Sequence, residues 1–408
     1  LCIAHRFGTS DEVDAYLVAF AIPVLVAYVV GEAIADAVIP AYTRKELRDH
    51  SAARRLISQA FLISLGLLTL CSLIAWFLSG EIAAVIGHQF ETAKQQLSAE
   101  MLRLLLPFAV FFGTAPILAG YLQVNDRFLV SSAAPGLVPM GTILLLLFLP
   151  DIRDGRLLSI GASAGALVYL ALLVLECQRK PETRLLASTL SAPPSRELLL
   201  MALPLMGGAL IHSGCYFTDT LMAASLEPGS VAVLDYGEKI CSIIKTVGAL
   251  ALGRVMLPHL SKLAAKSQWH TLKESVRAYT RLILILSGAA ILVLWFAATP
   301  AVRLLLERGA FTGEDTARVS DVLQFAAFQI PGYLLFEVAA CMVIALQGSR
   351  YMMVVAAIGL GVNVALNYLF MHWFEVKGIA LSTAITALLS AILCYIWSYR
   401  KIARDGER

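Results

Sequence analysis

Long apolar segments recur about a dozen times along this chain, and short polar gaps separate them. A bilayer core about 30 Å thick needs about 20 apolar residues to be crossed by one helix, and most of these segments reach that length. Hydrophobic residues make up 59% of the chain and charged residues 15%, against about 25% charged residues in soluble domains. The sequence therefore predicts an all-α, polytopic membrane protein, and the short gaps leave no room for a sizeable soluble or catalytic domain.

The expected spans lie at about 13–40, 56–80, 98–123, 128–149, 157–177, 197–224, 230–260, 279–299, 321–347, 351–372 and 377–399. Residues 1–7 resemble the end of a further span, whose beginning we expect to precede Leu1. Lys and Arg concentrate in every second gap, with about nineteen on one side and about seven on the other. The positive-inside rule places the richer side, together with the C-terminus, in the cytoplasm.

The two halves of the chain resemble each other at an offset of roughly 220 residues. The motif IPAYTR at 39–44 matches LPHLSK at 257–262, each at the end of an equivalent span. Parallel repeats about an axis along the membrane normal are typical of transporters whose site lies between two lobes. We therefore expect an N-terminal lobe at 1–190 and a C-terminal lobe at 191–408. They would be pseudo-symmetric six-helix lobes around a central cavity, with the first helix largely missing.

Acidic side chains inside the expected spans are candidates for ion or proton coupling. An ionisable group at the bilayer centre costs about 2.5–3.5 kcal/mol on insertion scales, so such groups tend to face a cavity or a partner. Glu32 and Asp36 are four residues apart and share one helix face. The two carboxylates could bind a cation between them, or they could lie at the cytoplasmic end of the span and be hydrated. Asp219 and Glu337 are lone acids in apolar spans. We predict cation or proton coupling at Asp36, Glu337 and Asp219, with hydrogen-bonded packing as the alternative.

The segment 230–260 carries an unusual run of charges. Asp235 and Lys239 have the spacing of an ion pair along one helix face, and Lys245 and Arg254 follow. Successive cations on one helix could line a path for an anionic head group, because Lys presents a compact charge to phosphate. The alternative is an ion pair within the helix, with the other cations reaching toward the membrane surfaces.

Several protein classes are excluded by what the sequence lacks. It has no GxxxxGK[ST] or HExxH motif, and its seven cysteines lie mostly in apolar segments without metal-ligand spacing. A net charge of +3 is too small to indicate nucleic-acid binding. These observations predict a transporter rather than an enzyme, with no metal site and no cofactor beyond a coupling ion such as Na⁺ or H⁺, or the membrane potential.

Five stretches resemble the MurJ/MviN family of lipid-linked glycan flippases, which belongs to a superfamily with multidrug antiporters and polysaccharide flippases. They are FGTSDEVDAYLVAFAIP (7–23), IPAYTRK (39–45), YLQVNDRFLVSSAAP (121–135), GSVAVLDYGEKICSIIKTVGALALGRVMLPHLSKLAA (229–265) and ERGAFTGEDT (307–316). The resemblance covers nearly the whole chain in the same order. It implies two lobes around a cavity that admits an undecaprenyl-pyrophosphate glycan, alternating access, and cations that hold the pyrophosphate.

The resemblance also implies roles for particular residues. Asp14 stands at the family's acid in the FG…DA stretch, and Glu32 stands near its acid in the second span. Glu238 and Lys239 stand at its acidic-basic pair, with Lys where an Arg is usual. The predicted substrate-binding residues are Lys239, Lys245, Arg254, Asp14, Glu32 and Glu238.

We predict a flippase of the bacterial inner membrane that translocates a polyprenyl-pyrophosphate-linked saccharide, with lipid II for peptidoglycan synthesis as the leading substrate. The family's basic positions in the second span are Ala21 and Ala27 here, which keeps an exopolysaccharide or O-antigen repeat unit as an alternative. A cation-coupled multidrug antiporter of the same superfamily is another. The expected partners are the lipid-linked glycan, the bilayer and enzymes of cell-wall or polysaccharide synthesis. We expect a monomer that binds no nucleic acid.

Overall fold

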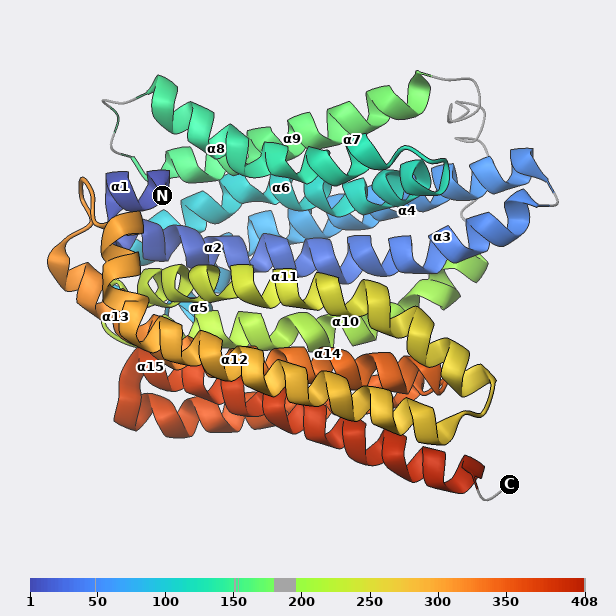
Figure 1. Ribbon diagram of the computed structural model, residues 1–408. Coiled ribbons are helices and arrows are strands. Elements are labelled where there is room, and N and C mark those ends of the chain that lie inside the picture. The colour runs from blue at the N-terminus through green and yellow to red at the C-terminus, as the bar shows by residue number, and fades with distance from the viewer. Residues whose placement is uncertain (48, 150–151, 153, 180–195, 407–408) are drawn as a thin grey trace. The chain divides into compact units, whose positions relative to one another are not determined.

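The computed structural model describes residues 1–47, 49–149, 152, 154–179 and 196–406, and its secondary structure in that part is helical (Figure 1). Nine helices of the described chain are long and apolar enough to cross a membrane. This confirms the prediction of an all-helical, multi-pass membrane protein.

Packing divides the chain into two compact units. The N-unit is Asp11–Ser225, and the C-unit is formed by Leu226–Arg408 together with Ile3–Ser10. The predicted lobes meet at residue 190, which lies outside the described residues, so that boundary stays a prediction. The two crossings of the chain between the units lie at 10–11 and 225–226.

The N-unit is built around one central helix, α6 (Thr92–Val124), which packs against α2 (Asp11–Val26), α3 (Ala33–Glu46), α4 (His50–Phe77) and α9 (Arg156–Gln178). The remaining elements are η1 (Ala27–Glu32), α5 (Ser79–Ile86), α7 (Phe128–Ala133), η2 (Ala134–Gly136), α8 (Leu137–Phe148) and α10 (Arg196–Ala223). The predicted span 197–224 corresponds to α10, which packs against α2, η1 and α3.

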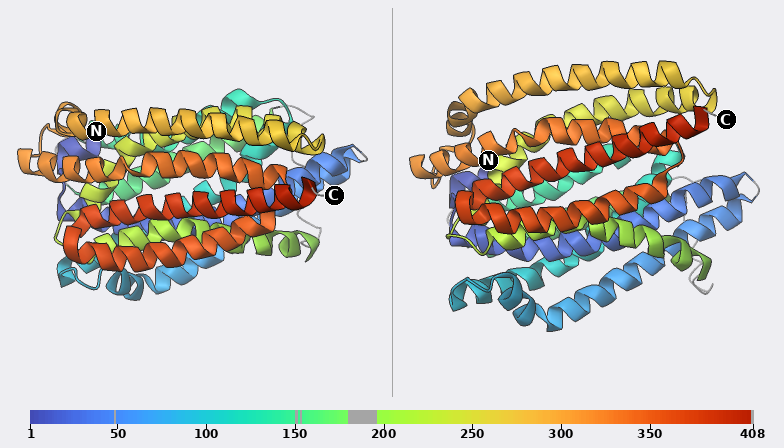
Figure 2. Two further views of the ribbon diagram at one scale, coloured as in Figure 1. Left: turned by 60° about the horizontal axis from the view of Figure 1, so that its bottom comes forward. Right: turned by 90° about the horizontal axis from the view of Figure 1, so that it is seen from below.

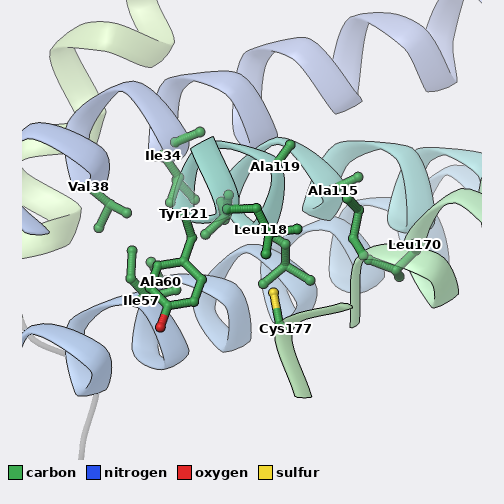
Figure 3. Packing of buried hydrophobic residues seen from close by; sticks show 14 of the residues in the cluster. Ile34, Val38, Ile57, Ala60, Ala115, Leu118, Ala119, Tyr121, Leu170 and Cys177 are labelled. Atoms are coloured by element: carbon green, nitrogen blue, oxygen red, sulfur yellow. The ribbon is translucent and has the colours of Figure 1, made fainter. Parts of the chain in front are cut away.

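The core of the N-unit forms where α6 meets α3, α4 and α9 (Figure 3). Tyr121 of α6 is fully buried, and its ring meets that of Tyr42 edge-on at 5.3 Å between centroids. Ile57 of α4 and Cys177 of α9 belong to the same cluster. A buried aromatic contributes a large apolar area, so this cluster fixes the four helices as one body.

Helix α2 continues through η1 into α3 as one 36-residue span, Asp11–Glu46. The η1 stretch is π-helical and begins four residues after Pro23, which has no backbone N–H to donate to the preceding turn. The last residue of η1 is Glu32. Short π-helical turns inside α-helices recur at functional sites, and this one ends at a predicted substrate-binding residue, Glu32.

The C-unit consists of α11 (Ser230–Ala265), α12 (Trp269–Leu306), α13 (Gly313–Ala326), α14 (Gln329–Ala345) and α15 (Ser349–Gly406), joined by most of α1 (Cys2–Phe7). Helix α12 lies along α13 and α14 (Figure 2), and α11 packs against α13 and α14.

The element α15 folds back on itself at Glu375, whose φ is 52°. Its two arms are visible as the red pair in Figure 1, and they correspond to the predicted spans 351–372 and 377–399. Gly378 lies so close to the carbonyl of Phe370 that a side chain there would overlap it. The reversal therefore depends on a left-handed backbone at Glu375 and on a missing side chain at Gly378.

Gly31 and Gly113 bring η1 and α6 into direct backbone contact, since a Cβ on Gly31 would overlap the Gly113 carbonyl oxygen. We predict that Gly31→Ala destabilises the protein by about 1–3 kcal/mol, because the helices must move apart. The measurement is the apparent unfolding temperature in detergent. Gly66→Ala on α4 is the control, because its Cβ would meet nothing within 4 Å. An equal effect of the two substitutions would contradict the close contact.

Candidate functional site

The charged run of α11 forms two ion pairs in the C-unit. Asp235 and Lys239 are one turn apart, and Glu238 and Lys245 are two turns apart. Residues four or seven positions apart lie on one face of a helix. The two pairs therefore follow adjacent faces of the same helix, and their surroundings differ.

Lys239 is more exposed than Lys245. Its Nζ lies 2.6 Å from Asp235 Oδ2, so the predicted pair forms. The Lys239 side chain is 63% exposed, whereas that of Asp235 is 13% exposed. An ammonium group has three N–H donors, and Asp235 accepts one of them. A pair of this spacing within one helix is worth only a few tenths of a kcal/mol, and the exposed ammonium group of Lys239 can turn to another anion.

Lys245 is held in a network that joins α11 to α14. Its side chain is 13% exposed, and its Nζ lies 3.0 Å from Glu238 Oε2. The same ammonium donates to Gln329 Oε1 on α14 at 2.6 Å. It also lies 5.9 Å from the ring centre of Tyr333. Its positive charge is therefore already compensated inside the C-unit.

Gln329 is the centre of this network and is almost completely buried. Its amide oxygen accepts from Lys245, while its amide nitrogen donates to Glu238 and to the carbonyl of Ala380 at 3.0 Å. The two N–H donors and the carbonyl of one amide are thus all used. We call Glu238, Lys245 and Gln329 the α11–α14 network.

Glu337 lies two turns beyond Gln329 on α14, where α14 packs against α11. Its carboxylate oxygen Oε1 would be 3.1 Å from a Cβ on Gly253, so the glycine makes room for the half-buried acid. The next residue along α11 is Arg254, whose side chain lies outside the described residues. The role predicted for Arg254 stays a prediction.

Asp14 lies near the start of α2 in the N-unit, and its side chain is buried. Lys94 of α6 reaches it at 2.9 Å and reaches Asp11 at 2.6 Å. Lys94 also lies 4.1 Å from the ring centre of Phe90. The buried carboxylate therefore has a partner on a different helix, and this pair ties α2 to α6.

Glu32 and Asp36 lie at the end of η1 and in the first turn of α3, and both are exposed in the chain. They share one face, as their spacing predicts. Asp219 lies one turn after Cys215 on α10 and is partly buried. The coupling roles predicted for Asp36, Glu337 and Asp219 stay predictions.

The structure brings together Glu238, Lys239 and Lys245 in the C-unit, and it places Asp14 and Glu32 on one continuous helix of the N-unit. Sequence reasoning missed Gln329, which has no charge and no motif around it, and it gave no role to Lys94. Among the described residues, no group of three or more His, Cys, Asp and Glu side chains could hold a metal ion.

The continuous spans, the two helical units and the charged helix α11 define a multi-pass transporter of the all-helical type. Two solved structures have this fold. "Lipid II flippase MurJ, inward closed conformation" aligns with a TM-score of 0.83 at 18% identity, covering 98% of this chain and 85% of that one. An inward-facing multidrug resistance MATE family transporter of the MOP superfamily aligns with 0.82 at 14% identity, covering 100% and 96%.

The sequence model described as "Lipid II flippase MurJ" matches residues 3–408, and the chain belongs to that family. A "Probable lipid II flippase MurJ" of Rickettsia prowazekii (strain Madrid E) is 23% identical over 408 residues, covering 98% of this chain and 79% of the relative. The "Lipid II flippase MurJ" of Burkholderia cenocepacia is 24% identical over 411 residues, covering 97% and 78%. The family membership implied by the sequence motifs is thereby confirmed.

Removing the buried amide should destabilise the C-unit. We predict that Gln329→Leu lowers the free energy of unfolding by about 1–3 kcal/mol, because Lys245 and Glu238 lose a buried hydrogen-bonding partner. Gln324→Leu on α13 is the matched control, since Gln324 makes one hydrogen bond, to the Trp295 carbonyl, at the surface. Thermal unfolding in detergent compares the two variants, and equal losses would contradict a central role of Gln329.

The Asp14–Lys94 pair gives a second stability prediction. Lys94→Met leaves a buried carboxylate without its cation, and breaking a buried pair from one side costs about 3–5 kcal/mol. Asp14→Asn combined with Lys94→Met should recover most of that loss, because the carboxylate that remains, Asp11, is exposed to water. A double-mutant cycle of unfolding free energies measures the coupling. Additive effects would show that the two charges do not depend on each other.

Proposed function

We propose that this chain is a lipid II flippase, which carries the polar head group of its substrate across the inner membrane by alternating access. The observation that carries this proposal is the family match over residues 3–408. The polyprenyl tail can stay in lipid during this movement, so the costly step is moving the charged pyrophosphate and the sugars through a hydrated cavity. The family resemblance implies a cavity that admits this head group.

Lys239 is the cation that we assign to the pyrophosphate. It is exposed, and its weak pair with Asp235 leaves donors for phosphate oxygens. Beyond Lys239, the exposed face of α11 carries Ile243, Val247 and Leu250. A cation followed by an apolar stripe suits an amphiphile with a charged head and a hydrocarbon tail. This surface supports a lipid-linked substrate over a fully polar one.

Lys245 and Glu238 have a different role in the proposal. Their charges are used within the α11–α14 network, so they set the position of α11 and the local potential. We still assign Arg254 and Glu32 to binding of the head group. We assign Asp14 to holding the helix that carries Glu32 in place, through its pair with Lys94. Asp36, Glu337 and Asp219 are assigned to a coupling ion, Na⁺ or H⁺, with the membrane potential as a further energy source.

The orientation follows from the charge asymmetry of the loops, which places the C-terminus in the cytoplasm. We propose that the protein works as a monomer in the bacterial inner membrane, close to the enzymes that make lipid II and those that consume it.

The direct test is translocation of lipid II by the intact protein in proteoliposomes. The lipid II carries a label on its head group, and the measurement is the rate at which an external reagent gains access to that label. We predict that Lys239→Ala lowers the transport rate by about tenfold or more, because a charge-assisted contact with phosphate is worth about 1.5–3 kcal/mol. Lys239→Arg should retain most of the rate, since Arg also binds phosphate.

Lys377→Ala is the matched control. Lys377 also pairs with an Asp of the C-unit, at 3.0 Å, and its side chain is partly exposed. Its removal should leave transport unchanged. Full transport by Lys239→Ala would refute the role of Lys239. No lipid II transport by the unaltered protein, combined with transport of another lipid-linked saccharide, would refute the proposed substrate.

A further inference from the structure

Residues 3–10 pack against the rest of the C-unit through unusually close backbone contacts, and we call this contact the joint. Gly8, Gly229 and Gly309 have φ values of 59°, 84° and 65°, and they are the glycines with positive φ in the described chain. All three lie at this joint. A Cβ on Gly229 would be 2.8 Å from the carbonyl oxygen of Thr9, and one on Gly309 would overlap that of His5. The backbone conformation and the close contacts both require glycine.

Backbone hydrogen bonds close the joint. The Ala310 amide donates to the His5 carbonyl at 2.8 Å. The Tyr236 hydroxyl of α11 donates to the Gly8 carbonyl at 3.0 Å, and both groups are buried. Residues 5–8 are therefore held from two directions, by the loop between α12 and α13 and by the side of α11.

Asp315 binds Thr9, the residue that follows Gly8. Its Oδ2 completes a capping box at the start of α13, accepting from the Thr312 amide at 2.8 Å and the Thr312 hydroxyl at 2.9 Å. Its other oxygen, Oδ1, accepts from the Thr9 hydroxyl. Because the capping box fixes the carboxylate to the first turn of α13, Thr9 is bound to a rigid point.

The loop that carries these contacts is itself tied to α13. The Thr316 hydroxyl donates to Glu307 Oε2 at 2.8 Å, and Arg303 lies 3.2 Å from the same oxygen. The Thr316 hydroxyl, together with the Arg303 charge, holds the pKa of Glu307 below its usual value. The acid therefore stays ionised, and both ends of the loop are attached to helices of the C-unit.

Arg318 holds the second segment that links the units. Both of its terminal nitrogens lie 3.4 Å from the Pro228 carbonyl, and one lies 3.5 Å from the Ser230 hydroxyl. Asp315 and Arg318 are three residues apart on α13 and so share one face. One face of α13 therefore binds both the segment that precedes the 10–11 crossing and the segment that follows the 225–226 crossing.

We infer that this face of α13 is the anchor of a hinge, and that Asp315 and Arg318 are positioning residues that fix both chain crossings to the C-unit. We call Thr9, Asp315, Pro228 and Arg318 the linker clasp. The inference rests on the proposed function, because a hinge matters only if the units rock during transport. With Thr9 bound, backbone rotation is confined to the residues directly at the two crossings, so the units move about a fixed axis.

The clasp makes a specific prediction about which unit residues 3–10 follow. These residues lead directly into α2 of the N-unit. Sequence continuity alone therefore predicts that they move together with α2. The clasp instead requires them to remain with α13 throughout the transport cycle. Hinge positions are a few residues at the ends of elements that absorb the change in φ and ψ, and the clasp limits them to the crossings.

The test uses the intact protein with its seven native cysteines replaced. Into this protein the two substitutions Thr9→Cys and Asp315→Cys are introduced together. Before cross-linking, this double variant lacks the hydrogen bond, and lipid II transport should fall by about tenfold. Cross-linking with a short bifunctional thiol reagent should restore transport, because a covalent clasp replaces the lost bond. Loss of the remaining transport on cross-linking would overturn the inference, as would full transport before cross-linking.

Single variants test the second half of the clasp. Arg318→Ala should slow transport by about tenfold, whereas Arg308→Ala should not. Arg308 lies in the same loop region, and its side chain donates to the Leu304 carbonyl in the last turn of α12 at 3.0 Å. Equal transport rates for the two variants would contradict the role of Arg318.

Spin-label distances separate this inference from the substrate assignment. His5 and Lys266 are exposed residues of the C-unit, and Glu91 is an exposed residue of the N-unit. Labels at 5 and 266 should keep one distance in every state, while labels at 91 and 266 should show two. A change in the first distance, or a single value for the second, would overturn the hinge. If lipid II is not transported but the distances behave as expected, only the proposed substrate fails.

Discussion

Compensation of charge inside apolar helices is the constraint on which this structure depends. A buried ion costs several kcal/mol unless a partner and further hydrogen bonds replace its water. In each unit one lysine meets that demand across helices: Lys94 joins α6 to Asp14 of α2, and Lys245 joins α11 to Gln329 of α14. Because Asp14 and Gln329 lie on other helices than the lysines that bind them, the contacts that satisfy these buried ammonium groups also fix how the helices pack.

Close backbone contact supplies the remaining cohesion. Helices in lipid gain little from burying apolar side chains against each other, so small residues at their contacts become important. Gly31 against Gly113 and Gly378 against Phe370 bring backbones together in the two units. Each unit is thus tied internally by polar pairs and by glycine contacts. Rigid units are what an alternating-access mechanism needs, since motion is then concentrated in the segments that connect them.

The helical membrane fold could be predicted from the sequence because the length of each apolar segment directly indicates the length of a membrane-spanning helix. Even the reversal within α15 was predicted as two spans, although the left-handed Glu375 that produces it gives no sequence signal. The ion pair of Asp235 and Lys239 was also predictable, since it depends only on spacing within one helix. Contacts between distant segments were not predictable, and Gln329 is the clearest example.

The joint at residues 3–10 shows the same limit. The stretches FGTS and ERGAFTGEDT were both recognised as family motifs, yet nothing in either one shows that Thr9 binds Asp315. Their glycines do not show which segments of the chain meet in the fold. The packing of residues 3–10 on the C-unit is a tertiary property, because it depends on where α13 begins relative to α11.

The contrast between the two lysines of α11 bears on how a flippase can turn over. A group that binds pyrophosphate on one side of the membrane must release it on the other, so the bound and free states must be close in free energy. Lys245 would have to break contacts with Glu238 and Gln329 before it could bind a ligand. Lys239 exchanges only an exposed contact with Asp235. Reversible binding therefore favours the exposed lysine for the substrate, and the buried one for holding α11 in place.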